Sequence, residues 1–574
     1  MARNRSPRQP DQRDILRALA ADEIGATAKP FGSVWPIAFC YPNTYHVGMS
    51  ALGFQTLISR VNEHPDAAVE RFFWNVSHPD ALGGRHRRPH LASSDLDNAG
   101  EDLADATPAH WPTDPPLSVE NQRRLDECPI VCFSIPFEMD DLHIIDMLER
   151  SNIRAWAALR GPNDPLIVIG GATVTMNRLP LYDFADVIVH GDGESAMDRL
   201  VEVLEETGPG RAGLREALRH EPGFEITNPR HPDDQDFDPA PPVPVSRLSL
   251  ADRLADIPTY TRILTPHTEF SNRGLVELSR GCPYKCNFCI MGYQPYNYKW
   301  RSPEDIERQA RTFLPHTKRI GLVASAVGIH KQIEEITERL MRLEMEISFS
   351  SLRVEDVKPV MIDALLASGQ KTLTIAPEAG NDRLRIQMRK RLHNDRIAQF
   401  AHETIARGMR NLKLYFMVGV MNETDDDVVS IAELTERLHG EQVSAARAHG
   451  HLGHLALNVG VFVPKPGTPQ RAGGFVGVGE ARRRLKLLRK GLKRIPNLKV
   501  HFSNPHLAAA QTILSCGDRR AADFLWWAWR HAKGDWPRAT REFEGLLEEF
   551  GAPLPVGADP SGAMGARDLL AVEA

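Results

Sequence analysis

Three cysteines lie close together in the chain, in the string Cys282-Pro-Tyr-Lys-Cys286-Asn-Phe-Cys289. Thiolates are ligands of zinc and of iron–sulfur clusters. A structural zinc site needs four ligands, which usually come as two separated pairs, and no fourth ligand is evident nearby. Three thiolates on one loop can hold three irons of a [4Fe–4S] cluster and leave the fourth iron without a protein ligand. The spacing therefore favours an iron–sulfur cluster over zinc.

The other cysteines do not suggest a disulfide framework. The chain has seven cysteines in 574 residues, whereas disulfide scaffolds are short and rich in cysteine. Cys40, Cys128 and Cys132 lie in or beside apolar segments, where a thiol packs as a small hydrophobic group. Cys516 lies in a predicted loop, where a role as a transient methyl carrier or proton donor is the minor alternative.

The clustered cysteines directly follow the first of a series of predicted strands. Short apolar segments alternate with longer helical stretches, which is the pattern of a β/α architecture. Six such strands predict an open (β/α)6 barrel of the TIM type, in which functional groups lie at the carboxyl ends of the strands. The segments are 274–281, 319–325, 346–354, 371–380, 411–419 and 455–464.

The N-terminal part of the chain shows a second, separate alternation of strands and helices. Apolar segments at 34–42, 129–136, 165–171 and 186–194 are separated by helical stretches, and residues 75–127 are irregular. Strands that are apolar throughout are buried on both faces, which indicates a parallel sheet covered by helices. We therefore expect an α/β chain that begins with a doubly wound parallel sheet.

These patterns divide the chain into five parts. A polar start reads as a flexible tail or a leading helix, and a Pro- and Asp-rich run separates the two alternating series. The C-terminal stretch is mainly helical and rich in tryptophan. The predicted parts are a tail at 1–30, the doubly wound domain at 31–228, a linker at 229–270, the barrel at 271–500 and the helical region at 501–574.

Composition limits the classes of partner. The formal net charge is −6, so no global positive field attracts nucleic acid or an anionic membrane. The basic run 482–494 carries an apolar stripe and predicts an amphipathic helix, with an RNA contact as the minor alternative. No apolar run approaches the roughly 20 residues that span a bilayer, and the first residues lack the apolar core of a signal peptide. We expect a cytoplasmic protein with no membrane span that does not bind nucleic acid.

The segment Ser279–Cys289 resembles the CxxxCxxC signature of the radical S-adenosylmethionine (SAM) superfamily, with an aromatic residue, Phe288, just before the third cysteine. The resemblance implies that the open iron chelates the amino and carboxylate groups of SAM. Reductive cleavage of SAM then yields methionine and a 5′-deoxyadenosyl radical. The resemblance also implies a low-potential electron donor of the flavodoxin or ferredoxin type.

Other strand ends are similar to the SAM-binding segments of this superfamily. The tract 376–380, Ala-Pro-Glu-Ala-Gly, looks like the fourth-strand segment that contacts SAM, and 417–424 looks like the turn along the adenine. The end of strand three is expected to contact the carboxylate of SAM. The second-strand end, 324–328, departs from the usual Gly-Gly-Glu pattern. The SAM-binding residues that the resemblance implies are Phe288, Ser350, Arg353, Glu378 and Gly419.

The order of a doubly wound domain followed by this barrel resembles the cobalamin-binding branch of the superfamily, an incompletely characterised group. Glycines after two strands, and the segment after the first strand, carry the resemblance. Glycine permits close approach of a ligand to the backbone at the carboxyl edge of such a sheet. The implied cobalamin-binding residues are Asn43, Tyr45, Gly170, Gly171, Thr173, Gly191, Asp192, Gly193 and Glu194.

The chain lacks the Asp-x-His-x-x-Gly string with which corrinoid proteins provide a histidine to cobalt. The nearest string is Asp141-Leu-His143-Ile-Ile-Asp146, where Asp146 replaces the glycine. We interpret His143 as a surface or packing histidine on a helix, and cobalt would then lack a protein imidazole. A vestigial domain that binds no cobalamin is the alternative.

Taken together, these features predict a cobalamin-dependent radical SAM methyltransferase that acts on an unactivated carbon of an unidentified small-molecule or macromolecular substrate. One SAM would methylate the cofactor and a second would supply the radical. Two alternatives stay open. One is a cobalamin-assisted rearrangement, cyclisation or oxidation without methyl transfer. The other is an RNA-binding or scaffold protein with a structural cluster, which a fourth protein ligand would favour.

Overall fold

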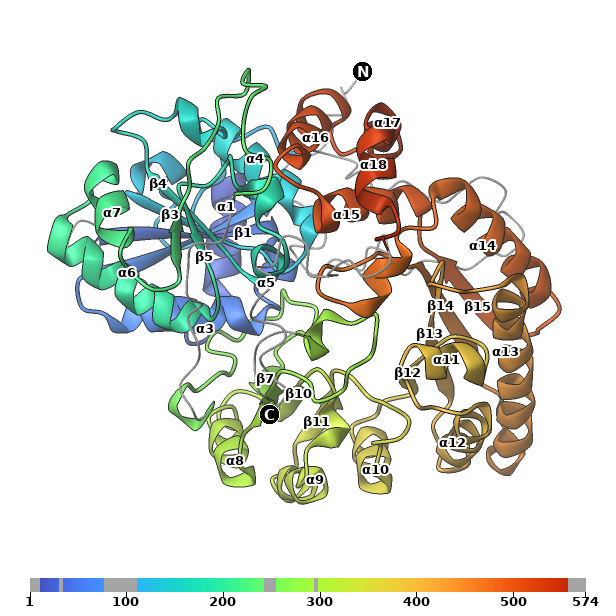
Figure 1. Cartoon of the computed structure of the whole chain (residues 1–574). Coiled ribbons are helices and arrows are strands. Elements are labelled where there is room, and N and C mark those ends of the chain that lie inside the picture. The colour runs from blue at the N-terminus through green and yellow to red at the C-terminus, as the bar shows by residue number, and fades with distance from the viewer. Residues whose placement is uncertain (1–10, 30–34, 77–110, 242–253, 294–297, 556–574) are drawn as a thin grey trace, which may run out of the picture. The chain divides into compact units, whose positions relative to one another are not determined.

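The computed structural model describes residues 11–29, 35–76, 111–241, 254–293 and 298–555 (Figure 1). The described residues form two units by their internal contacts. The first unit contains the described residues up to 241 and residues 259–272. The second contains residues 254–258 and the chain from 273 onward. Each unit is treated by itself below.

The first unit is built on one six-stranded sheet, and the strand order is β2-β1-β3-β4-β5-β6. All neighbouring strands are parallel except β5 and β6. This confirms the predicted doubly wound sheet. The strands are β1 (Trp35–Thr44), β2 (Ala67–Asn75), β3 (Ile130–Ser134), β4 (Leu166–Gly170), β5 (Val187–Val189) and β6 (Phe224–Ile226).

The order of the strands reverses between β1 and β3, because the chain moves from β1 outward to β2 and then back to the other side of β1. In open α/β sheets, ligands bind at such a switch point, outside the carboxyl ends of the strands. The helices that connect the strands are α2 (Tyr45–Gly48), α3 (Leu52–Glu63), α4 (Asp141–Arg150), α5 (Ala172–Met176), α6 (Gly193–Thr207) and α7 (Arg211–Leu218).

Strand β2 was not predicted, because two charged residues interrupt its apolar pattern. Glu70 and Arg71 are both buried. Arg71 bonds with the carboxylates of Glu23 and Glu120, and Glu70 accepts a 2.6 Å hydrogen bond from the side chain of Asn121. Buried charges require such pairing. The partners that permit this burial are distant in sequence. The pattern of apolar and polar residues in this segment therefore does not predict a strand.

Two segments outside the predicted doubly wound domain pack into the first unit. Helix α1 (Gln12–Ala21) buries Ile15, Leu16 and Leu19 in the core, so the described part of the predicted tail includes a leading helix. Most of the described part of the predicted linker, residues 229–241 and 259–270, also joins this unit. There the side-chain oxygen of Gln55 accepts 3.0 Å hydrogen bonds from the backbone nitrogens of Arg262 and Ile263.

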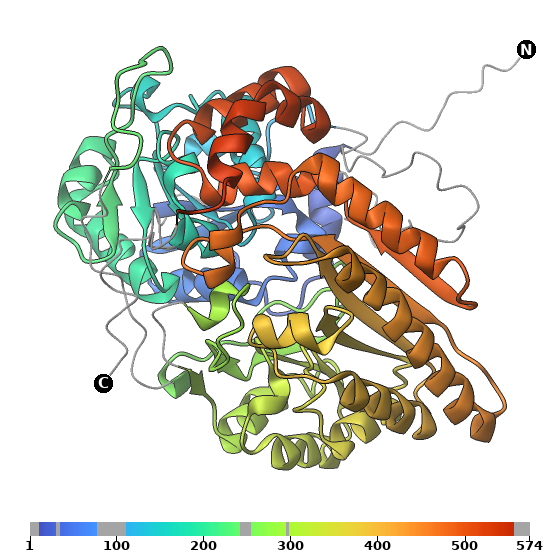
Figure 2. The same cartoon turned by 45° about the vertical axis from the view of Figure 1, so that its right-hand side comes forward.

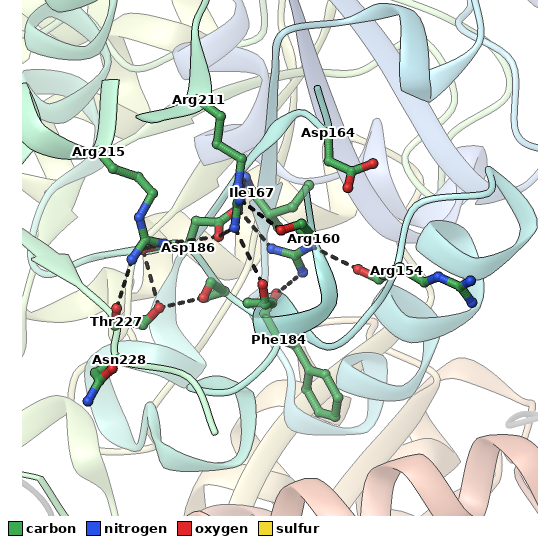
Figure 3. Close-up of polar contacts among 12 residues, drawn as sticks. Arg154, Arg160, Asp164, Ile167, Phe184, Asp186, Arg211, Arg215, Thr227 and Asn228 are labelled. Carbon is green, nitrogen blue, oxygen red and sulfur yellow. Dashed lines mark hydrogen bonds and ion pairs between the residues drawn. The ribbon is translucent and has the colours of Figure 1, made fainter. Parts of the chain in front are cut away.

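A cluster of arginines around Asp186 fixes the amino ends of β4 and β5 (Figure 3). Asp186 precedes β5 and accepts hydrogen bonds from Arg160 (2.8 Å), Arg211 (2.6 Å), Arg215 (3.0 Å) and the backbone nitrogen of Ile167 (2.9 Å). Although burial alone would raise the pKa of Asp186, the arginines lower it below its ordinary value. The arginines also bond to backbone carbonyls, for example that of Thr227. The cluster therefore stabilises the edge of the sheet that lies opposite the switch-point edge.

The second unit contains two parallel sheets. One has the order β11-β10-β7 and the other β12-β13-β14-β15. All six predicted barrel strands are present, which confirms the partial barrel. The strands are β7 (Gly274–Glu277), β10 (Arg319–Val323), β11 (Glu346–Phe349), β12 (Thr372–Glu378), β13 (Asn411–Val418), β14 (Leu455–Val461) and β15 (Leu498–Phe502).

Helices follow the barrel strands in turn, and Figures 1 and 2 show them along the outer side of the two sheets. A short antiparallel ribbon of β8 (Ser279–Arg280) and β9 (Lys299–Trp300) flanks the cysteine loop. The helices are α8 (Pro303–Arg311), α9 (Ile333–Arg342), α10 (Pro359–Ala367), α11 (Asp382–Gln387), α12 (Asn394–Ala406), α13 (Asp425–Ala446) and α14 (Val478–Leu492).

The seventh strand, β15, was not predicted. Its sequence, Leu-Lys-Val-His-Phe, alternates apolar and polar residues, which is the signal of a half-buried edge strand. The last part of the unit is helical as expected, with α15 (Pro505–Cys516), α16 (Ala521–Trp527), α17 (Trp536–Glu542) and α18 (Glu544–Gly551). Among the residues described, no helix is both long enough and apolar enough to cross a membrane.

Candidate functional site

The three clustered cysteines lie on the loop that follows β7 and β8. Cys286 is buried, and Cys282 and Cys289 are half-buried. Asn287, between two of them, fixes the loop: its backbone nitrogen donates to Met388 O at 3.0 Å and its side chain to Gln387 O at 2.8 Å. The loop is therefore tied to the C-terminal end of α11, which follows β12 of the second sheet.

The loop also closes tightly on itself. A Cβ at Gly292 would lie 2.1 Å from the carbonyl oxygen of Tyr284, so no side chain fits there. Burial raises the pKa of Cys282 and of Cys289, and the negative charge of Glu378 adds to the increase at Cys289. Binding of iron requires the thiolate form, so the metal must displace these protons.

The three thiols form a donor set that fits a [4Fe–4S] cluster. In a cluster each thiolate binds a different iron, so three sulfurs on one loop need not meet at a point.

Glu378 ends β12 in an unusual conformation. The pairing of β12 with β13 shifts register between Ile375 and Glu378, and Glu378 has a φ of 69°. A non-glycine residue in this region carries strain that often marks a functional site. The Glu378 carboxylate accepts a 3.0 Å hydrogen bond from Lys390 Nζ, which also donates to Ala376 O. The bulge and the lysine together fix the direction of this carboxylate.

An apolar cluster draws the predicted site segments together. It joins neighbours of Cys289, Glu378 and Gly419 to the residue that follows β14. It thereby holds the cysteine loop beside the ends of three strands, β12, β13 and β14. Its buried members are Ala379, Leu384, Met388, Val420 and Phe462, with Phe288 and Met417 packed against them. Packing against this cluster explains why an aromatic residue precedes Cys289.

Gly419 forms the turn after β13 with a φ of 90°, and a Cβ there would lie 2.8 Å from Val476 Cγ1. Its backbone nitrogen donates a 2.6 Å hydrogen bond to Glu423, whose carboxylate also accepts from Arg484 at 2.6 Å. Burial raises the pKa of Glu423 to about 7, and its Oε1 atom is buried without a hydrogen-bond partner. Glu423 lies within the segment 417–424 but is not among the predicted SAM-binding residues; a carboxylate four residues after a turn glycine was the available signal.

The two predicted residues at the end of β11 have different surroundings. Ser350 is exposed, and its hydroxyl bonds with the backbone of Ala324 at 3.1 Å, which joins the ends of β10 and β11. Arg353 lies against the cysteine loop instead. Its Nη1 atom is 3.6 Å from Cys286 Sγ, and its guanidinium stacks 3.7 Å from the centre of the Tyr284 ring.

In the first unit, Tyr45, Thr173 and Gly171, which the sequence predicts to bind cobalamin, lie against the protein's own groups. Tyr45 is fully buried and donates a 2.6 Å hydrogen bond to Glu23. The Thr173 hydroxyl donates to Ile135 O at 3.1 Å. Gly171 has a φ of 120°, and a Cβ there would lie 2.5 Å from the same carbonyl oxygen. Glycine is therefore required here because Gly171 lies directly against the backbone of Ile135.

Asn43 occupies the switch point. The pairing of β1 with β2 shifts register between Tyr41 and Thr44, so Asn43 leaves the ladder at the carboxyl end of β1. Its side chain donates a 2.8 Å hydrogen bond to Asp140, in the loop after β3. Burial raises the pKa of Asp140 to about 7. A neutral amide and a carboxyl group that is partly protonated at neutral pH thus face each other where a ligand of this fold would lie.

The remaining predicted residues of this unit lie at the carboxyl ends of β4 and β5. Gly170 ends β4, and Gly191 follows β5 with a φ of 102°. Asp192 precedes α6, and Gly193 and Glu194 form its first turn, with Glu194 buried. The fold therefore brings these residues to the same edge of the sheet as Asn43.

His143 is a packing histidine, one of the two roles predicted for it. Its ring stacks on Trp74 with 3.9 Å between centroids, and its Nδ1 atom lies 2.8 Å from Pro42 O. Burial lowers the pKa of His143 to about 4, so the ring is neutral at pH 7. Nδ1 therefore carries the proton that is donated to Pro42 O.

Comparison with known proteins agrees with this geometry. Residues 276–435 match the family described as the radical SAM superfamily, and residues 106–225 match the family described as the N-terminal region of radical SAM proteins. An uncharacterised protein of Methanocaldococcus jannaschii is 24% identical over 493 residues, which are 85% of this chain and 90% of that protein.

Two solved structures are similar at low identity. The radical S-adenosylmethionine methyltransferase TsrM from Kitasatospora setae, with cobalamin and a [4Fe–4S] cluster bound, is 12% identical with a TM-score of 0.49 over 89% of this chain and 100% of its own. The cobalamin-dependent S-adenosylmethionine radical enzyme OxsB is 12% identical with a TM-score of 0.44 over 93% of this chain and 78% of its own.

The matched residues 276–435 include the cysteine loop and the ends of β10, β11, β12 and β13, and this family implies a [4Fe–4S] cluster and SAM as cofactors. The chain therefore belongs to the radical SAM superfamily and is a radical SAM enzyme.

Proposed function

We propose that this enzyme binds cobalamin in its first unit and methylates an unactivated carbon. The observation that carries the proposal is the strand order β2-β1-β3-β4-β5, with its switch point between β1 and β3. This arrangement presents a ligand edge at the carboxyl ends of the strands. The segments that resemble cobalamin-binding radical SAM enzymes lie along that same edge.

Asn43, Gly170, Gly191, Asp192 and Glu194 are the residues that would hold the cofactor. The rim of a corrin carries amide groups, which pair with neutral polar side chains. Asn43 and the partly protonated Asp140 beside it are of this kind, and the displacement of Asn43 from the β1 ladder fits a ligand at this position. Tyr45, Gly171 and Thr173 would act indirectly, by shaping the loops that carry the contacts.

When bound, cobalamin supplies a cobalt centre that accepts and delivers methyl groups. The chain's own contribution in the second unit is to hold three thiols on one closed loop and to direct the Glu378 carboxylate by its bond to Lys390. A low-potential flavodoxin or ferredoxin is the electron donor that this chemistry requires.

The test is anaerobic reconstitution with iron and sulfide, followed by gel filtration with and without added cobalamin. We expect the protein to retain cobalamin and to show a base-off absorption spectrum, because His143 is occupied by Pro42 O and Trp74. The variant Asn43→Ala is expected to retain less cobalamin with unchanged iron content, and Asn163→Ala, at an exposed position of the same unit, serves as a matched control. Protein that retains no cobalamin would overturn the proposal.

Methyl transfer is tested separately from cofactor binding. SAM with an isotopically labelled methyl group is incubated with the reconstituted enzyme, reductant and a panel of candidate substrates, and products are analysed by mass. The proposal predicts S-adenosylhomocysteine together with 5′-deoxyadenosine, since one SAM gives the methyl group and a second gives the radical. Formation of 5′-deoxyadenosine alone, with cobalamin bound, would instead indicate rearrangement, cyclisation or oxidation.

A further inference from the structure

Arg353 lies beside one ligand of the cluster and not in an open position at the mouth of the barrel. Its Nη1 atom donates to Cys286 Sγ at 3.6 Å, and its side chain is 13% exposed. Cys286 is the middle and most buried of the three cysteines. An arginine is always charged in proteins, so a fixed positive charge touches the sulfur that binds one of the irons.

The position of Arg353 is determined on several sides. Its guanidinium stacks on Tyr284 with 3.7 Å to the ring centroid, and Tyr284 lies between the first two cysteines. Its Nη2 atom donates to Glu355 at 2.9 Å, and its Nε atom is 3.5 Å from an oxygen of Asp356. The Tyr284 hydroxyl donates to both oxygens of Asp356 at 2.9 Å. Arg353, Tyr284 and Asp356 therefore form a closed set of contacts.

The backbone around this set leaves little room for rearrangement. A Cβ at Gly328 would lie 2.5 Å from the carbonyl oxygen of Asp356, so the loop after β10 presses directly on the loop that carries Arg353. A planar guanidinium can stack on a ring and donate to a sulfur in its own plane at the same time, whereas an ammonium group cannot. The site is thus built for arginine.

We propose that Arg353 is a positioning residue that sets the reduction potential of the cluster through the Cys286 thiolate, and that it does not bind the carboxylate of SAM. Hydrogen bonds to ligand sulfurs and nearby charge are among the main determinants of iron–sulfur potentials. One-electron reduction adds a negative charge to the cluster. A cation and a hydrogen-bond donor at the sulfur stabilise the reduced form and make reduction easier.

Glu355 and Asp356 limit the net charge of this environment but do not cancel the effect. The negative charge of Asp356 acts on Cys282, whereas the guanidinium donates directly to the sulfur of Cys286. The stabilisation falls with distance, so the nearest group dominates. The inference rests on the three-cysteine cluster and is independent of cobalamin binding.

The experiment compares the wild type with Arg353→Gln, each reconstituted with iron and sulfide under anaerobic conditions. The SAM-free cluster is titrated with dithionite in the presence of redox mediators, and the reduced cluster is followed by electron paramagnetic resonance. We expect the equilibrium constant for one-electron reduction to fall about tenfold in Arg353→Gln, which is a shift of about 59 mV to more negative potential. Arg342→Gln, at an exposed position on α9, is the control and is expected to keep the wild-type potential.

A measurement of SAM affinity distinguishes an effect of Arg353 on the cluster potential from the predicted role of Arg353 in binding the carboxylate of SAM. If Arg353 binds the carboxylate of SAM, Arg353→Gln will leave the SAM-free potential unchanged and weaken SAM binding, and this result would overturn the proposal. Should Arg353→Gln assemble no cluster, Arg353→Lys decides the matter. Lysine keeps the charge but cannot both stack on Tyr284 and donate to Cys286, so we expect a smaller negative shift. A wild-type potential in Arg353→Lys would equally overturn the proposal.

Discussion

The side chain of Asn43 donates a 2.8 Å hydrogen bond to Asp140, and this bond joins the loops that follow β1 and β3. The two residues are 97 positions apart in the chain, and they meet because the strand order reverses between these strands. Burial raises the pKa of Asp140 to about 7. A buried carboxyl group at the ligand edge of the sheet is therefore a source of pH dependence.

Asp140 should make the stability of the protein fall as pH rises. The unfolded chain ionises Asp140 near its ordinary pKa of about 4, whereas the folded protein holds the proton up to about pH 7. The folded state therefore loses stability relative to the unfolded state between about pH 4 and pH 7, by at most roughly 4 kcal/mol for a shift of about three units.

The variant Asp140→Asn tests this dependence. Asparagine keeps an acceptor for Asn43 but does not titrate. The free energy of unfolding of Asp140→Asn should therefore fall less between pH 5 and pH 8 than that of the wild type. Urea denaturation at several pH values measures the free energy of unfolding of both proteins. Other groups titrate equally in the two proteins, so their contributions cancel in the difference. Parallel curves for the two proteins would contradict a raised pKa at Asp140.

Replacement of Cys282, Cys286 and Cys289 together by alanine should abolish the cluster. The wild type is expected to bind about four irons per chain after reconstitution, as one [4Fe–4S] cluster requires. The triple variant should be colourless and form no 5′-deoxyadenosine from SAM. Replacement of Cys40, which is buried in β1 of the first unit, by alanine is the matched control and should leave the iron content unchanged. Undiminished iron in the triple variant would refute the assignment.

Glu378→Gln should weaken the binding of SAM while the cluster stays intact. Glutamine has the same shape as glutamate and can keep the same backbone conformation. It lacks the negative charge that attracts Lys390 and would attract the ammonium group of a ligand. A lost charge-assisted hydrogen bond corresponds to roughly 1–3 kcal/mol of binding free energy. Equilibrium binding of SAM to the reconstituted protein measures it, with the exposed Glu433→Gln on α13 as control. Equal affinities in the wild type and Glu378→Gln would remove Glu378 from the SAM site.

Arg71→Met should strongly destabilise the first unit. Glu23 and Glu120 would lose the cation that they share, and both carboxylates are buried. Removal of one partner of a buried ion pair costs about 3–5 kcal/mol. Urea denaturation followed by circular dichroism provides the measurement. Arg17→Met, in an exposed pair with Asp14, should change the stability by less than about 1 kcal/mol; similar losses in the two variants would exclude a special role for the buried network.

Local patterns in the sequence predicted the cluster ligands and most of the strands. The spacing of Cys282, Cys286 and Cys289 indicated the cluster, and the alternation of apolar strands with helices predicted both the doubly wound sheet and the six barrel strands. These predictions succeeded because both features depend on residues that are close together in the sequence. The cluster ligands lie on one loop, and the burial of each strand shows in its own run of apolar residues.

The contacts between distant side chains became evident from the folded chain. It revealed β2, whose Glu70 and Arg71 are permitted by partners distant in sequence, and it showed that Gly171 accommodates the backbone of Ile135. It also placed Arg353 on Cys286, 67 residues away in the chain. Such contacts arise when strand ends converge at one edge of a sheet, and no periodicity along the chain encodes which groups will meet there.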